Sequence, residues 1–171
     1  MTMAFLVFAG VFLFIAGLYI LVPPFFGPSS IPTRHERIRK ALRLANLQPD
    51  EILYDLGAGD GRVLVIAAKE FGAQAVGVEI GPVQCAVSWG NALRNRVSSK
   101  IKIEAGNFYH VDLNKADVVF AYLTSDQAGR LQGKFERELK KGARVVTISF
   151  SLPDWEPVYL DRDDLIFLYE K

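Results

Sequence analysis

Residues 52–62 have the sequence Ile-Leu-Tyr-Asp-Leu-Gly-Ala-Gly-Asp-Gly-Arg. The apolar first half predicts a buried strand, and the glycines after it predict a tight turn into a helix. Glycine at positions 57, 59 and 61 lets the backbone approach a ligand closely, next to the free NH groups of the helix start. The stretch therefore predicts a nucleotide-like cofactor site, although such a loop can also be a purely structural turn.

The acid within the first strand favours one cofactor over another. A dinucleotide site has the pattern GxGxxG, with glycine or alanine at position 62, whereas this chain has GxGxG followed by Arg62. Dinucleotide-binding strands usually end in apolar residues, but here the acid Asp55 occupies the strand. A carboxylate suits a cofactor with an ammonium and a sulfonium group, so we expect S-adenosyl-L-methionine in preference to NAD.

A second acid agrees with this expectation. Residues 75–80, Ala-Val-Gly-Val-Glu-Ile, form a continuous apolar run that predicts another parallel strand, with Glu79 and Ile80 at its tip. A carboxylate at this point, about 20 residues after the first glycines, can accept hydrogen bonds from both hydroxyls of a ribose.

The remaining pattern alternates between helix and strand, as in an α/β fold with a Rossmann-like, doubly wound, mostly parallel seven-stranded sheet. We expect helices over 33–46, 61–71, 82–96 and 126–140, strands over 100–104, 117–122 and 143–150, and a closing hairpin from 158–160 and 165–169. Ligands of such sheets bind outside the carboxyl ends of the strands. Asp55, Glu79, Asn107 and Tyr122 are all expected there.

An uncharged apolar run of 20 residues, 3–22, precedes this domain. As a helix it would be about 30 Å long, the thickness of the hydrocarbon core of a bilayer. We expect an N-terminal transmembrane helix as an anchor over 1–23, a proline-rich linker over 24–32 and the catalytic domain over 33–171. The alternative is a buried core helix, which would have to be apolar all round.

The charges after the run predict its orientation. Arg34, Arg37, Arg39, Lys40 and Arg43 follow it, with only Glu36 among them. By the positive-inside rule, we expect a single-pass protein of the cell membrane whose domain is cytoplasmic. The same cluster could bind anionic headgroups of the lipid bilayer or be the solvated face of a helix.

Composition argues against several other classes of site. The net charge is +1, which disfavours a nucleic-acid-binding track, so no nucleic-acid partner is expected. A single cysteine, Cys85, permits no internal disulfide, and with only two histidines no metal site is expected.

The chain resembles the class I S-adenosylmethionine-dependent methyltransferases, and within them the small protein-lysine methyltransferases. These include broad-specificity archaeal enzymes and the ATP-synthase c-subunit lysine methyltransferases. The resemblance covers about residues 28–157 through Pro-Ser-Ser at 28–30, Tyr-Asp-Leu-Gly-Ala-Gly-Asp-Gly-Arg at 54–62, Val-Gly-Val-Glu at 76–79, Gly-Asn-Phe at 106–108, Tyr-Leu at 122–123 and Leu-Lys-Lys-Gly-Ala-Arg-Val-Val at 139–146. Those enzymes commonly have Ser-His after Arg-Val-Val, whereas this chain has Thr147 and Ile148.

The resemblance implies a role for each residue of the predicted site. Asp55 and the loop residues Gly57, Ala58, Gly59 and Gly61 would surround the methionine part of the cofactor. Glu79 would bind the ribose, with Ile80 beside it among the cofactor-binding residues, and Asn107 and Phe108 would contact the adenine. Tyr122 would lie beside the transferring methyl group as the catalytic residue.

Each of these roles has a structural alternative. Asp60 could be a helix N-cap, Asn107 an ordinary loop residue, and Phe108 a packing residue. Tyr122 could simply fill the core, and Trp155 could line an acceptor pocket or cover the sheet.

The resemblance implies methyl transfer to lysine side chains of a protein, possibly a membrane protein. The tip of the fourth strand has the sequence Ala-Tyr-Leu-Thr at 121–124, without the Asn/Asp-Pro-Pro-Tyr motif of methyltransferases that act on adenine or glutamine amides. One alternative is a methyltransferase for a membrane-soluble quinone or lipid. Another is a non-enzymatic cofactor-binding assembly protein.

Overall fold

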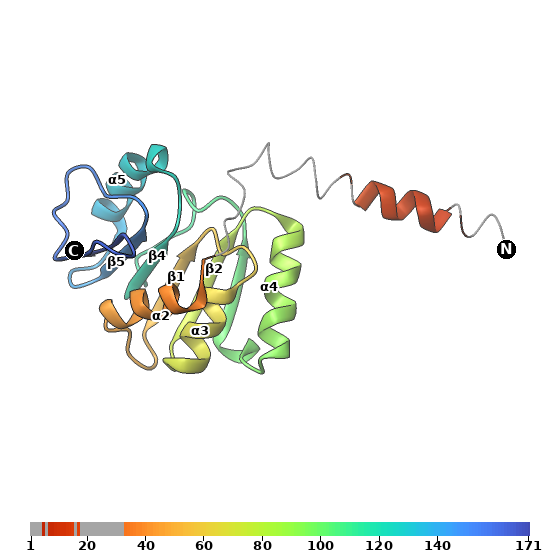
Figure 1. The fold of residues 1–171 in the computed structure, drawn as a ribbon, viewed down its shortest axis with the longest axis horizontal. Coiled ribbons are helices and arrows are strands. Elements are labelled where there is room, and N and C mark those ends of the chain that lie inside the picture. Colours follow the sequence, from red (N-terminus) through yellow and green to blue (C-terminus); the bar gives the residue numbers. More distant parts are fainter. Residues whose placement is uncertain (1–4, 6, 16, 18–32) are drawn as a thin grey trace.

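The computed structural model describes residues 5, 7–15, 17 and 33–171 (Figure 1). Residues 33–171 build one seven-stranded sheet with the strand order β3-β2-β1-β4-β5-β7-β6. The strands are β1 (Ile52–Leu56), β2 (Gln74–Glu79), β3 (Ile101–Ala105), β4 (Val118–Ala121), β5 (Arg144–Ile148), β6 (Tyr159–Asp161) and β7 (Ile166–Glu170). Strands β1 to β5 pair in parallel, and β7 runs antiparallel to both β5 and β6. The predicted seven-stranded, mostly parallel sheet is therefore confirmed.

Helices cover both faces of the sheet, which explains why its central strands are apolar throughout. Helices α2 (His35–Leu44), α3 (Arg62–Glu70) and α4 (Pro82–Arg94) lie on one face, and α5 (Ala128–Glu138) lies on the other. Neighbouring residues of β1 point to opposite faces. Leu53 belongs to the core under α2 and α3, whereas Tyr54 belongs to the core under α5.

All four predicted helices end one or two residues sooner than the sequence indicates, with α3 ending at Glu70. Helix α4 stops at Arg94, because Arg96 has a φ of 60° in the left-handed region. The segment predicted as a helix over 126–140 begins with a 3₁₀ turn, Ser125–Gln127, and its α-helix ends at Glu138. Thr124 and Gln127 form a capping box at this start. The predicted helix over 33–46 is α2, and it ends at Leu44.

Two cations of the basic cluster after the apolar run form ion pairs within the domain. Arg39 forms ion pairs with Glu70 at 2.8 Å and Glu36 at 2.7 Å. Lys40 pairs with Asp161 at 2.6 Å and with Asp164 at 2.7 Å. These contacts attach α2 to α3 and to the β6–β7 hairpin, so two of the five cations stabilise the fold rather than face solvent alone.

The predicted anchor over 1–23 lies largely, and the predicted linker over 24–32 entirely, outside the described residues. Residues 5, 7–15 and 17 are helical. Within the part of the chain that the structure describes, no helix has both the length and the apolar character needed to cross a membrane.

Candidate functional site

The glycine-rich loop after β1 has the backbone conformation that its sequence predicts. Gly57, Gly59 and Gly61 all have positive φ angles, of 88°, 55° and 77°. L-amino acids with a side chain rarely adopt this region, so glycine is needed for the turn. Gly61 also has a packing role, because a Cβ atom there would lie 2.1 Å from the Oγ atom of Ser88 in α4. Gly57 is exposed at the carboxyl edge of the sheet.

Ala58 packs into the protein, and its backbone closes the loop onto β2. Its NH donates a hydrogen bond to the carbonyl of Val78 at 3.1 Å, and the NH of Gly57 donates to the same carbonyl at 2.9 Å. Its methyl group lies only 2.8 Å from where a Cβ atom on Gly77 would be. The small residues Ala58 and Gly77 thus bring the loop close to the neighbouring strand.

The carboxylate of Glu79, at the tip of β2, is held by two backbone groups. Its Oε2 atom accepts a hydrogen bond from the NH of Gly59 at 2.8 Å, and its Oε1 atom accepts one from the NH of Gly81 at 2.9 Å. Each oxygen retains a further lone pair for a hydroxyl donor. Next to Glu79, the apolar side chain of Ile80 is partly exposed. The two residues offer a fixed acceptor pair and an apolar surface at one strand tip.

Asp55 is a buried acid one residue before the end of β1. Burial, together with the negative charges of Glu79 and Asp60, raises the pKa of Asp55 to about 8. Burial disfavours the charged carboxylate because it removes the carboxylate from water, and Glu79 and Asp60 disfavour it because like charges repel. A positively charged ligand would relieve both effects.

Asp60 is neither the helix N-cap nor a free carboxylate. Gly61 is the N-cap residue of α3, and Asp60 forms an ion pair with the guanidinium of Arg62 at 2.6 Å. This contact lowers the pKa of Asp60. Arg62 also donates a hydrogen bond to the carbonyl of Thr33 at 2.9 Å. The residue that breaks the dinucleotide pattern therefore ties the loop to the segment before α2.

Asn107 and Phe108 follow β3 at the same edge of the sheet. The Oδ1 atom of Asn107 accepts a hydrogen bond from the NH of Tyr109 at 3.0 Å, which is an Asx turn. Phe108 packs against Tyr109, with 4.6 Å between the ring centroids. Asn107 is thus a turn residue, as its structural alternative predicts, and it is exposed.

Tyr122 and Trp155, the two aromatic candidates, lie in different places. Tyr122 follows β4 at the carboxyl edge, where the guanidinium carbon of Arg37 lies 5.6 Å from its ring centroid. Trp155 lies 6.2 Å from the ring of Tyr169, which pairs with Val145 near the start of β5. Trp155 therefore covers the sheet, and its predicted alternative as an acceptor-pocket residue is not supported by these contacts.

Arg37 is a residue of this edge that the sequence does not reveal. Its Nε atom donates to the carbonyl of Asp164 at 2.7 Å, and its Nη2 atom donates to Oγ of Ser149 at 3.0 Å. These partners are more than a hundred residues away in sequence, so no local pattern indicates the contact. Leu123 is a second such residue, because it lies 3.3 Å from where a Cβ atom on Gly57 would be.

The charge of this edge fits the predicted cofactor. Asp55, Asp60 and Glu79 gather around the loop, and Arg62 neutralises only Asp60. Among the described residues, no cation pairs with Asp55 or Glu79. S-adenosyl-L-methionine has a positive ammonium and a positive sulfonium group, which the carboxylate of Glu79 would attract and which would favour ionisation of Asp55.

Comparison with known proteins agrees with the geometry. A sequence profile of the ANTKMT methyltransferase domain matches residues 55–159. The chain belongs to this methyltransferase family. It is 40% identical over 128 residues to a protein-lysine N-methyltransferase of Saccharolobus islandicus, covering 74% of this chain and 80% of the relative. The ATP synthase c-subunit lysine N-methyltransferase of Xenopus laevis is 27% identical over 165 residues, covering 91% of this chain and 72% of the relative.

A solved structure shares both fold and sequence with this methyltransferase. An RNA methyltransferase from Salinibacter ruber, in complex with S-adenosyl-L-homocysteine, is 30% identical and superposes with a TM-score of 0.80. The match covers 82% of this chain and 93% of that chain. The resemblance to class I methyltransferases and the assignment of S-adenosyl-L-methionine as cofactor are therefore confirmed. When bound, this cofactor supplies a methyl group that its sulfonium has already activated.

Proposed function

We propose that this family member is a protein-lysine N-methyltransferase. The observation that supports this best is the acidic cofactor edge around Asp55 and Glu79, in a chain that is 40% identical to an archaeal enzyme of that name. Several curated relatives that cover most of this chain are also lysine methyltransferases. The protein then needs to place an acceptor amine in line with the methyl group, within about 3 to 3.5 Å.

The surroundings of Tyr122 suit the deprotonation that lysine requires. A lysine amine has a pKa of about 10.4 in water and must be neutral to attack. Partial burial beside an aromatic ring disfavours the ammonium form, and so does a neighbouring positive charge. Tyr122 provides the ring, and Arg37, 5.6 Å from its centroid, provides the charge. Tyr122 would thus desolvate the amine, and Arg37 would help to keep it neutral.

The architecture of the edge favours an acceptor that belongs to a large molecule. The connection to β6 and the β6–β7 hairpin follow β5. Trp155, the largest side chain of that connection, packs against Tyr169 and away from Tyr122. Among the residues that the structure describes, little covers the carboxyl edge, whereas an enclosed pocket for a quinone or lipid would require such a cover.

Labelled methyl transfer with blocked acceptors tests this proposal. The full-length protein is incubated with methyl-labelled cofactor and a cell extract, and protein, lipid and RNA fractions are then counted separately. We expect label in the protein fraction, and we expect that reductive methylation of all lysines in the extract beforehand abolishes it. Label only in the lipid fraction would support the quinone or lipid alternative, and label only in RNA would support the activity named for the Salinibacter relative.

We also propose that the protein is attached to the membrane by its apolar N-terminal run, with the catalytic domain on the cytoplasmic side. The uncharged residues 3–22 and the cations that follow support this. Described residues of that run, such as Phe8 and Phe12, are helical and more than 70% exposed, which is unfavourable in water. Release of the full-length protein by alkaline carbonate, or digestion of the domain by protease outside intact cells, would contradict this topology.

A further inference from the structure

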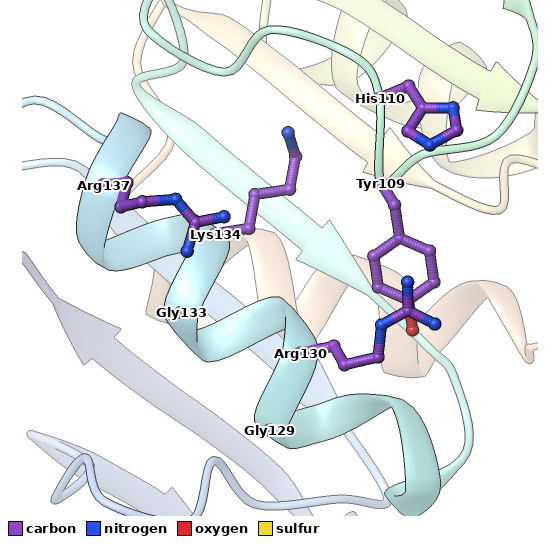
Figure 2. Close-up of a pocket in the computed structure, with 7 residues that line it drawn as sticks. All are labelled: Tyr109, His110, Gly129, Arg130, Gly133, Lys134 and Arg137. Atoms are coloured by element: carbon purple, nitrogen blue, oxygen red, sulfur yellow. The ribbon is translucent and has the colours of Figure 1, made fainter.

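A basic pocket lies on the α5 face of the sheet (Figure 2). Its volume is about 400 Å³, and it is lined by one side of α5 and by Tyr109 and His110 from the loop after β3. Arg130 and Arg137 of α5 lie at its two ends in Figure 2, with Lys134 between them.

The pocket adjoins the edge at which the acceptor must approach. Helix α5 begins directly after the connection that leads from β4 and Tyr122, so Arg130 lies in its first turn. Tyr109 and His110 leave the same edge from β3. Tyr122 itself packs with the core on the α2 side of the sheet, so a chain that places a lysine beside Tyr122 would cross the carboxyl edge before it extends along α5 into the pocket.

The charge of the pocket comes from its two arginines. Lys134 is buried and already neutralised, since its Nζ atom contacts both oxygens of Glu138, at 2.8 and 2.6 Å. By contrast, the guanidinium of Arg130 stacks on the ring of Tyr109, at 4.0 Å from its centroid. Stacking fixes the plane of a guanidinium and leaves its in-plane NH donors available to a carboxylate. Within the part of the chain that the structure describes, neither Arg130 nor Arg137 pairs with an acid.

Two glycines of α5 form part of the pocket wall. A Cβ atom on Gly129 would meet nothing within 4 Å, and one on Gly133 would approach only Arg137, at 3.4 Å. Glycine inside a helix costs about 1 kcal/mol relative to alanine. This destabilisation occurs at two positions one turn apart, both on the side of the helix that faces the pocket. Space for a ligand backbone explains Gly129, whereas glycine at position 133 leaves room for the guanidinium of Arg137.

We propose that this pocket binds acidic side chains that flank the acceptor lysine of the protein substrate. The inference rests on the proposed lysine methyltransferase function and defines the chemical class of its substrate. Carboxylates of the bound segment accept hydrogen bonds from Arg130 and Arg137, and its backbone approaches α5 at Gly129.

An acidic peptide fits the pocket better than RNA does. Single-stranded nucleic acid is bound by a cationic track together with aromatic faces on which bases stack. Here the cations number two, and Arg130 and Phe108 already contact the ring of Tyr109. The chain as a whole has a net charge of only +1.

Binding of a fluorescent peptide to the full-length protein tests the proposal without requiring turnover. The probe has glutamates on both sides of one lysine, and a matched peptide has glutamines in their place. We expect the glutamate peptide to bind more tightly, and we expect Arg130→Glu with Arg137→Glu to weaken that binding by about tenfold while cofactor affinity is unchanged. The matched control is Arg94→Glu, an exposed arginine of α4 on the other face of the sheet, which should change neither.

A charge swap and a filled pocket complete the test. A peptide with lysines in place of the glutamates should bind the double variant better than the parent. Gly129→Leu should leave thermal stability equal or higher, because leucine is the better helix former, yet it should reduce binding of the glutamate peptide. Equal affinities for the glutamate and glutamine peptides would overturn the proposal. Equal affinities of the double variant and the Arg94→Glu variant for the glutamate peptide would do so too. The proposal would also be overturned if an RNA oligonucleotide inhibited methyl transfer to the extract while the glutamate peptide did not. If the peptide binds as expected but methyl transfer to the cell extract yields no methyl-lysine, the proposed function fails and the binding site for an acidic segment remains.

Discussion

The NH of Gly59 in the loop after β1 donates a hydrogen bond to the carboxylate of Glu79 at the tip of β2, over 2.8 Å. This bond joins the two sequence motifs that identify the site. The carboxylate is also held by Gly81, so its orientation is fixed before any ligand arrives. Preorganisation of this kind reduces the entropy lost on binding.

Loss of the Glu79 carboxylate should weaken cofactor binding. For Glu79→Ala we expect a loss of about 1.5 to 3 kcal/mol, the value of a charge-assisted hydrogen bond, in calorimetric titration with S-adenosyl-L-methionine. Glu170→Gln, an exposed acid of β7, is the control and should bind normally. Neither protein should bind NAD. Unchanged affinity in the Glu79 variant would contradict this assignment.

Cofactor binding should release a proton from Asp55. Its pKa is about 8 in the folded protein, so its carboxyl is protonated at neutral pH, and a positively charged ligand favours the carboxylate. The calorimetric enthalpy at about pH 7 should therefore depend on the ionisation enthalpy of the buffer, and this dependence should fade above about pH 9. It should be absent in Asp55→Asn. A parent protein without buffer dependence at pH 7 would show that Asp55 does not gain charge.

The same group should make folding stability fall as the pH rises. An acid whose pKa is raised on folding binds its proton more tightly in the folded state than in the unfolded chain. Between the unfolded value of 3.8 and the folded value of about 8, each increase in pH therefore favours unfolding through this group. Asp55→Asn removes the effect, so the denaturation midpoint of the variant should rise relative to that of the parent from pH 4 to pH 8. A difference in denaturation midpoint that stays constant from pH 4 to pH 8 would contradict a raised pKa of Asp55.

Gly61→Ala should destabilise the fold. The change forces a side chain into a φ of 77° and places its Cβ 2.1 Å from Ser88 Oγ and 2.9 Å from Ser88 Cβ. We expect about 2 to 4 kcal/mol of lost stability in thermal or denaturant unfolding. Gly90→Ala in α4 is the matched control, since nothing lies within 4 Å of its Cβ position, and it should be neutral or stabilising. Equal stability of the two variants would show that the contact with Ser88 is tolerant.

The local parts of the site are the parts that sequence predicts well. The strand, the glycine loop and the start of α3 depend on residues that are neighbours in the chain, and the hairpin of β6 and β7 is local in the same way. The contact between Arg37 and Tyr122 depends on Asp164 and Ser149, which only the tertiary fold brings near. The same is true of the pairing of Lys40 with Asp161 and Asp164. The sequence position of a cation does not indicate its partner. The basic pocket beside α5 could not be predicted either, because Tyr109 and His110 meet α5 only in the tertiary fold.

Tyr122 should matter for transfer more than for cofactor binding. Tyr122→Ala removes the ring that Arg37 covers and that, in the proposed function, desolvates the acceptor amine. We expect the rate of methyl transfer at saturating cofactor to fall by about tenfold or more, with cofactor affinity nearly unchanged. Tyr122→Phe keeps the ring and should retain most activity. A parallel loss of cofactor affinity would instead make Tyr122 a cofactor-binding residue.

The chemical identity of the product tests the lysine assignment most directly. The full-length protein transfers labelled methyl groups to proteins of a cell extract, and the protein fraction is hydrolysed in acid and separated into amino acids. Heat-denatured protein serves as the inactive control. The proposed function predicts label in methylated lysine, absent from the control reaction. Label in the hydrolysate that migrates with any other amino acid, or no label in the protein fraction while lipid or RNA is labelled, would contradict it.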